Sequence, residues 1–157
     1  CTIKLIGNCR RQNGSVFAYV LPHLIKEHNL LSDVDNEYNG ILLESAFTDK
    51  QFFVGKGAGG TATGSAVLSD ISALLYNYRY EYKKIKQANQ PAFTNDVQLK
   101  IYLRYKNPEH VELSEFYSIS EKYESPTWRY IVGVINLEKL KEADWLTNKD
   151  VNILVLE

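Results

Sequence analysis

The sequence contains no methionine and only two cysteines, Cys1 and Cys9. The two cysteines lie close together in one strand-like stretch, so they do not suggest the framework of a disulfide-stapled domain. No CxxC pair and no cluster of cysteine and histidine indicates a zinc site. A reducing cytoplasm fits this cysteine usage best. Because the chain opens without methionine inside an apolar stretch, we expect it to be an excised piece of a longer protein.

Long apolar runs and an excess of either charge are also missing. No run is long enough to span a bilayer, and no charged-then-apolar leader is present. The 18 basic and 19 acidic residues give a net charge of -1, so neither a nucleic acid nor an anionic membrane is an expected partner. His23, His28 and His110 are scattered, at spacings that indicate neither a metal site nor a triad. The 45% hydrophobic content predicts a globular chain with one ordinary core or two small ones.

The first half of the chain predicts four strands and a helix. The strands are expected at residues 2–9, 16–21, 40–44 and 51–54. Asn13-Gly14 tolerates the positive φ of a tight turn, so the first two strands should form a hairpin. Pro22 is expected to end the second strand, and residues 27–37 to form a loop or short helix. Helical spacing of apolar residues from 67 to 85 predicts a helix of several turns.

The second half is predicted to be a separate, smaller unit. Residues 86–96 are polar and contain a proline, which predicts a linker between residues 1–85 and residues 97–157. Beyond the linker the pattern alternates between strand and helix periods. Strands are expected at 97–104, 128–136 and 151–156, and helices at 113–120 and 137–146. The predicted order is β-α-β-α-β, an open α/β sandwich.

A glycine-rich stretch, Gly55-Lys56-Gly57-Ala58-Gly59-Gly60, lies between the last strand of the first half and its helix. Without Cβ atoms, the backbone N–H groups of such a turn can approach a ligand closely, and the start of a helix favours negative charge. Phosphate binding is one interpretation. The other, equally weighted on the loop alone, is a turn that only connects a strand to a closely packed helix.

The wider string, residues 54–70, closely resembles the homoserine dehydrogenase pattern of G-x-G-A-G, a short spacer, T-x-S-A-V and an acidic residue. Further segments resemble the same family in the same order. They are residues 3–5, 20–22, with the pattern V-x-P, 30–34 and 39–41. The resemblance covers roughly residues 1–80, and the glycine loop with its helix is its most specific part.

The resemblance implies an α/β (α+β) fold, with a partial homoserine dehydrogenase-like sheet and helices packed on it. It also implies an NAD(P)-dependent oxidoreductase that interconverts aspartate 4-semialdehyde and homoserine in threonine and methionine biosynthesis, using NADP or NAD. The cofactor contact carried over is Gly57, with Gly55, Ala58 and Gly59 as its supporting neighbours. Lys56 stands where the family often has proline, so the loop is either less rigid or gains a contact to an anion, and a solvated lysine is the favoured reading.

No residue of this chain is predicted to be catalytic, and none to bind a metal. The family's Rossmann domain, its catalytic lysine and the acidic residues that hold homoserine all precede the matching segment. Residues 1–85 are therefore expected to be the C-terminal part of the catalytic and dimerisation domain, inactive by itself. A homodimer is expected from the family's habit.

Residues 97–157 stand where many members of the family carry an ACT domain, and they are predicted to be an ACT-like regulatory or dimerising unit. The family's effector turn usually has a Pro-Gly pair, whereas this chain has Lys106-Asn107-Pro108-Glu109. The alternative to a part of an enzyme is therefore an amino-acid-effector-binding or dimerisation module without a catalytic role.

Overall fold

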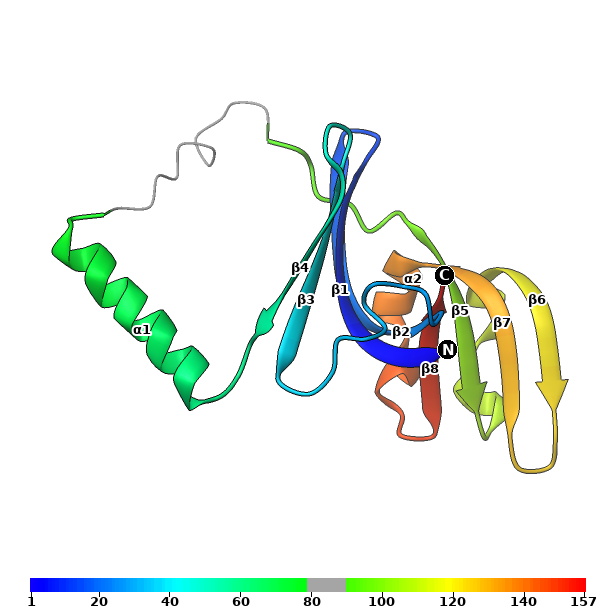
Figure 1. The fold of residues 1–157 in the computed structure, drawn as a ribbon. Coiled ribbons are helices and arrows are strands. Elements are labelled where there is room, and N and C mark those ends of the chain that lie inside the picture. The colour runs from blue at the N-terminus through cyan, green and yellow to red at the C-terminus, as the bar shows by residue number, and fades with distance from the viewer. Residues whose placement is uncertain (79–89) are drawn as a thin grey trace. The chain divides into compact units, whose positions relative to one another are not determined.

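A computed structural model describes residues 1–78 and 90–157 of the chain (Figure 1). Its contacts divide the chain into two compact units. One unit joins Cys1–Ile25 to Pro91–Glu157, and the other is Lys26–Gln90. This division differs from the expected division into residues 1–85 and 97–157, because the first hairpin shares a sheet with the last four strands. Which of those parts is a catalytic, dimerising or ACT-like domain stays a prediction.

The first unit is built on a six-stranded sheet. Its strands follow one another across the sheet in the order β1-β2-β8-β5-β7-β6. Every neighbouring pair is antiparallel except β2 and β8, which pair in parallel. The strands are β1 (Thr2–Gln12), β2 (Ser15–Ile25), β5 (Gln98–Tyr105), β6 (Phe116–Glu124), β7 (Arg129–Asn136) and β8 (Val151–Leu156).

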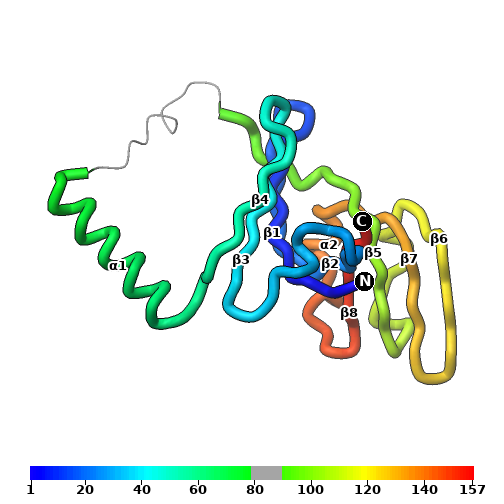
Figure 2. The backbone as a smooth tube through the Cα atoms, viewed as in Figure 1, coloured from blue at the N-terminus to red at the C-terminus, as the bar shows by residue number. Residues whose placement is uncertain are grey.

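The predicted hairpin of β1 and β2 is confirmed, and it is longer than expected (Figure 2). Its turn has positive φ at both central residues, 51° at Asn13 and 82° at Gly14, as a two-residue hairpin turn requires. The prediction that Pro22 ends the second strand is wrong, since β2 continues to Ile25. Counting from the turn, Pro22 falls opposite Leu5 at a non-hydrogen-bonded position. Its missing N–H therefore costs the β1–β2 ladder nothing.

The last four strands interleave as two split β-α-β units, in the order β8-β5-β7-β6. The first connection is two 3-10 turns, Pro108–His110 and Leu113–Glu115, and the expected helix at 113–120 is wrong because β6 begins at Phe116. β6 carries two register shifts, one between Phe116 and Ser118 and one between Ile119 and Glu121. These bulges break the period of two, so the apolar residues fell by chance at helical spacing.

One face of this sheet is covered by the chain between β7 and β8. The expected helix there is confirmed as α2 (Leu137–Glu142), followed by a 3-10 turn at Asp144–Thr147. Asn136 caps the start of α2, because its side-chain oxygen accepts a hydrogen bond from the backbone N–H of Glu138 at 2.9 Å. Apolar side chains of these segments pack against every second residue of β5 and β7. The buried cluster includes Leu99, Ile101, Leu103, Ile131, Ile135, Leu137, Leu140, Trp145 and Val155.

The second unit contains a hairpin and a helix. β3 (Tyr38–Ser45) pairs antiparallel with β4 (Asp49–Lys56), which confirms the two expected strands with longer bounds. The helix α1 (Gly60–Leu75) ends before the expected residue 85, and the part of that prediction at 79–85 lies outside the described residues. No residue of α1 is buried. Its exposed apolar side chains are Val67, Leu68, Ile71, Leu74 and Leu75.

The described part of the expected linker lies along β2. Val16 donates its backbone N–H to Ala92 O at 2.8 Å and accepts at its own oxygen from Thr94 N at 2.9 Å. Phe93 accordingly forms a bridge with Val16. Residues 92–94 are therefore tied to the first unit, while residues 86–89 lie outside the described chain.

Candidate functional site

The glycine-rich stretch crosses from the end of β4 to the start of α1 (Figure 1). Gly59 precedes the helix with φ at 106°, and its carbonyl accepts the helical bond from Thr63 N at 3.0 Å. A residue with a side chain rarely adopts this backbone conformation, so a glycine is required here. No side chain of the described chain caps this helix start. Its first N–H groups are therefore available to water or to an anion.

Gly57 is held from the side of β3. Its backbone N–H donates to Glu37 O at 2.7 Å. A Cβ on Gly57 would come within 2.9 Å of Asn39 Oδ1 and would overlap with the other two amide atoms of that side chain. The close approach of Asn39 is thus a structural reason for glycine at this position.

Gly55 stands in a different environment. It lies within β4, opposite Asn39, and an added Cβ would meet nothing within 4 Å. Its φ is not positive, so neither space nor backbone conformation requires glycine there. Ala58 is exposed, as are the three glycines. The four predicted cofactor residues, Gly55, Gly57, Ala58 and Gly59, therefore share one exposed stretch. Of the three glycines, only Gly55 lacks a structural reason for its small size.

The side chain of Lys56 contacts two residues of the facing segment, Glu37 and Tyr38. Its Nζ lies 3.0 Å from Glu37 Oε1 and 5.6 Å from the centre of the Tyr38 ring. A hydrogen bond from its own backbone N–H, and then the bond from Lys56, lower the pKa of the Glu37 carboxyl below its usual value. Both side chains remain about half exposed. Lys56 is therefore exposed to solvent as expected, but it also has a carboxylate partner that the sequence did not predict.

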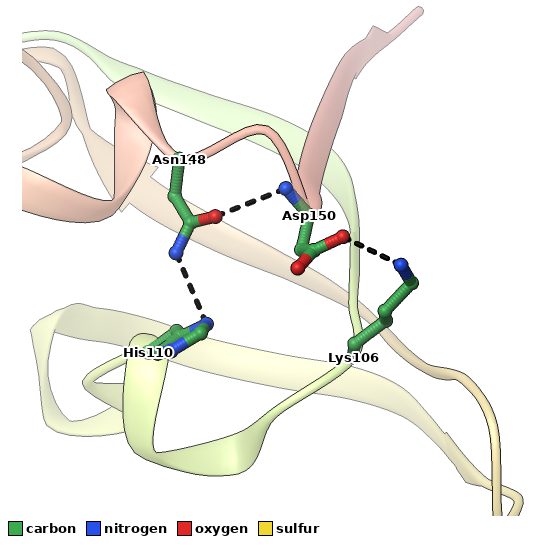
Figure 3. A network of polar contacts seen from close by, with 4 residues as sticks. All are labelled: Lys106, His110, Asn148 and Asp150. Carbon is green, nitrogen blue, oxygen red and sulfur yellow. Dashed lines mark hydrogen bonds and ion pairs between the residues drawn. The ribbon is translucent and has the colours of Figure 1, made fainter.

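The turn after β5, where the resemblance predicts an effector turn, is filled by a network of polar side chains (Figure 3). Lys106 Nζ lies 2.6 Å from Asp150 Oδ1. Asn148 Oδ1 accepts from Asp150 N at 3.0 Å, which leaves its Nδ2 to donate to His110 Nδ1 at 3.0 Å. Side chains of the turn itself are thus committed to the segment that precedes β8.

Within residues 1–78 and 90–157, no three His, Cys, Asp or Glu side chains gather where they could hold a metal ion. No described helix has the length and apolar character needed to cross a membrane. Cys1 and Cys9 are both exposed, and neither forms a disulfide.

Comparison with known proteins adds to this geometry. Residues 1–72 match the family model of homoserine dehydrogenase. The chain matches a fragment of homoserine dehydrogenase. The Bacillus subtilis homoserine dehydrogenase is 36% identical over 78 residues, which are 50% of this chain and 18% of that protein. The Corynebacterium glutamicum homoserine dehydrogenase is 35% identical over 81 residues, 48% of this chain and again 18% of the relative. The chain thus spans about a fifth of the length of these relatives.

Solved structures extend the likeness to the second half of the chain. A homoserine dehydrogenase from Thiobacillus denitrificans matches 99% of this chain with a TM-score of 0.65, at 23% identity over 42% of its own chain. That from S. aureus, at pH 8.5, matches 99% of this chain with a TM-score of 0.51, at 27% identity over 41% of its own chain. The mixed α/β fold expected from the sequence is therefore confirmed, and the chain is similar to homoserine dehydrogenases.

Two residues that bear on the loop were missed by the sequence analysis. Glu37, just before β3, and Asn39, within β3, both contact the glycine stretch. Asn39 belongs to one of the segments that resemble homoserine dehydrogenase, so a signal for it was present. For Glu37 no pattern was available, because its contacts depend on how β3 and β4 pair.

Proposed function

We propose that this chain is the C-terminal part of a homoserine dehydrogenase and supplies the loop that closes over the nicotinamide end of the cofactor. The whole enzyme would interconvert aspartate 4-semialdehyde and homoserine, in threonine and methionine biosynthesis. The observation that carries the proposal is the glycine string at residues 55–60, which lies within the matched segment and stays exposed before an uncapped helix start.

The residues present fit a nicotinamide dinucleotide, NADP or NAD. When bound, such a cofactor supplies or accepts a hydride. Backbone without side chains at Gly55 and Gly57 would admit it closely, with Ala58 and Gly59 forming the rest of the loop. Uncapped N–H groups at the start of α1 would favour its negative charge. These residues bind and orient, and we assign none of them a role in moving the hydride or a proton.

The chain by itself is proposed to be inactive. Apolar side chains stay open along α1, where Leu74 is 74% exposed and Leu75 is 77% exposed. Exposed apolar surface of this kind marks a site of contact with another protein surface. This surface supports the proposal that a further part of the parent enzyme packs against α1. The catalytic residues would lie in that further part. A cytoplasmic location is proposed, because Cys1 and Cys9 form no disulfide.

Substitution at Gly55 tests the loop without disturbing the fold. In the enzyme expressed from the full reading frame, Gly55→Val should raise KM for the cofactor while the melting temperature is unchanged, because valine suits a strand and meets open space here. The matched control is Gly64→Ala, another glycine with nothing within 4 Å, one turn into α1. A cofactor KM that stays the same in both variants would show that the loop only connects a strand to a helix.

The second candidate function is pairing of subunits without catalysis. β1 is an edge strand of 11 residues, and its exposed side chains include Ile3 and Leu5, 58% and 73% exposed. A long edge with apolar side chains readily pairs with another chain. Sedimentation equilibrium should then give a dimer that Leu5→Lys dissociates. A monomer at high concentration would end this candidate.

An ACT-like effector role for residues 97–157 has support in the interleaved order of β5–β8. The filled turn at Lys106 weighs against an open effector site. Calorimetry with threonine and methionine decides between them: heat of binding would support an effector role, and its absence with both would leave pairing of subunits.

A further inference from the structure

Glu37, the residue just before β3, makes two contacts with the start of the glycine loop. We infer that Glu37 is a positioning residue that anchors this loop, and that its ion pair with Lys56 makes the anchoring sensitive to salt. The inference rests on the proposed function only for its consequence in the enzyme. The anchoring itself is a property of this chain.

Glu37 makes its two contacts with different groups. Its backbone oxygen accepts from Gly57 N at 2.7 Å, which extends the β3–β4 pairing by one residue beyond the strands. Its carboxylate lies 3.0 Å from Nζ of Lys56, the residue just before Gly57. Glu37, the residue just before β3, therefore holds two consecutive residues at the point where β4 becomes the loop.

The two contacts differ in what weakens them. The bond between Gly57 and Glu37 joins neutral backbone groups and is little affected by ions. The pair of Lys56 with Glu37 is 54% and 43% exposed at its two side chains, so dissolved salt screens it. A proline at position 56 would restrict the backbone covalently, through φ. In this chain an ion pair holds Lys56 instead, and salt should loosen that pair.

Proline itself is compatible with the hairpin at position 56. Because Glu37 and Gly57 are hydrogen-bonded, the adjoining pair of Tyr38 and Lys56 is a non-hydrogen-bonded one. The backbone N–H of Lys56 therefore does not bond to β3. Lys56→Pro removes the ammonium without removing a bond of the β3–β4 ladder.

Hydrogen exchange of the Gly57 amide, followed by NMR in this chain, measures the anchor directly. Raising the salt concentration should speed this exchange roughly threefold, the order expected for an exposed ion pair. Glu37→Gln should give the fast exchange at all salt concentrations, since its backbone oxygen remains but its charge is gone. Lys56→Pro should restore slow exchange and remove the salt dependence.

The matched control is Glu44→Gln, which removes an exposed carboxylate from the far end of β3, the strand that Glu37 precedes. This variant should keep the wild-type exchange of Gly57 and its response to salt. Equal exchange in Glu37→Gln and Glu44→Gln would overturn the inference, as would a salt response that persists in Lys56→Pro.

Kinetics of the full-length enzyme separate the two proposals. If the loop binds the cofactor, salt and Glu37→Gln should both raise KM for the cofactor, with kcat less affected, and Lys56→Pro should remove the salt effect on KM. Altered Gly57 exchange with unchanged KM would mean that the anchor exists but the loop does not serve the cofactor. Unaltered exchange would refute the anchor whatever the kinetics show.

Discussion

The side chain of Asn39 occupies the space in which a side chain on Gly57 would begin. The two residues lie on facing segments of one hairpin, beside the bond between Gly57 N and Glu37 O. This contact changes how a substitution of Gly57 is understood. Loss of activity in a Gly57 variant would report on the hairpin as well as on any ligand, whereas Gly55 reports on the ligand alone.

We predict that Gly57→Ala destabilises the second unit by about 1 kcal/mol, because Asn39 must swing toward solvent to make room. Asn39→Ala removes the obstructing amide. A double-mutant cycle of chemical denaturation should therefore show that Gly57→Ala costs much less when Asn39 is already alanine. Equal costs in both backgrounds would contradict the crowding of these residues.

A stronger effect is expected at Gly133, which is buried in β7. A Cβ there would lie 2.7 Å from the backbone oxygen of Ser118 and 2.8 Å from Phe116 Cδ1. Backbone cannot move aside as a side chain can, so Gly133→Ala should lower the free energy of unfolding by about 1–3 kcal/mol. Gly7→Ala is the control, since its Cβ would rest 3.8 Å from Val20 Cγ2 in ordinary contact. Similar denaturation midpoints for the two variants would count against this account of β7.

Gly64 should respond in the opposite direction. It lies inside α1, and a Cβ there meets nothing within 4 Å. Alanine loses less conformational freedom on helix formation, so Gly64→Ala should stabilise α1 by about 0.5–1 kcal/mol. Circular dichroism at 222 nm during heating measures this change. A loss of helical signal would show that Gly64 has a role that the described contacts omit.

His23 should make the first unit sensitive to acid. Its side chain is only 2% exposed, and neither ring nitrogen has a hydrogen-bond partner among the described residues. Burial lowers the pKa of His23 below its ordinary 6.5, while Glu157, whose Oε1 lies 3.8 Å from Nδ1, opposes the shift. The folded state thus binds a proton less readily than the unfolded chain. Stability is full above about pH 6.5 and declines as the pH falls toward the lowered pKa.

Urea denaturation between pH 7.5 and pH 5 measures this dependence. His23→Leu places an apolar side chain that cannot titrate in the same buried position. It should flatten the dependence of the free energy of unfolding on pH over that range. His28→Gln, at an exposed position, should leave the profile unchanged. A wild-type profile that His23→Leu does not alter would assign the acid sensitivity to another group.

Local sequence signals predicted part of the fold. The Asn13-Gly14 turn was foreseen because few residues tolerate two successive positive φ angles. β6 was not foreseen, because its bulges disguise the alternation on which strand prediction depends. The parallel pairing of β2 with β8 joins residues more than a hundred positions apart. No local pattern specifies such a partner.

The candidate site, too, could be predicted only in part from local sequence. The glycine string at residues 55–60 and its helix could be predicted, since glycine before a helical period has a recognisable pattern. Gly55 and Gly57 could not be told apart, because crowding by Asn39 depends on the register of β3 against β4. Glu37 was missed for the same reason.

By itself, the sequence determined the turns, most strands, the helix after the glycine loop and the resemblance to homoserine dehydrogenase, because these follow from backbone preferences and from short motifs. Only the tertiary structure decided which strands share a sheet, where Pro22 is tolerated and which side chains hold the loop. Those outcomes depend on contacts between residues that are far apart in the chain or on opposite strands, and they are set by packing and register.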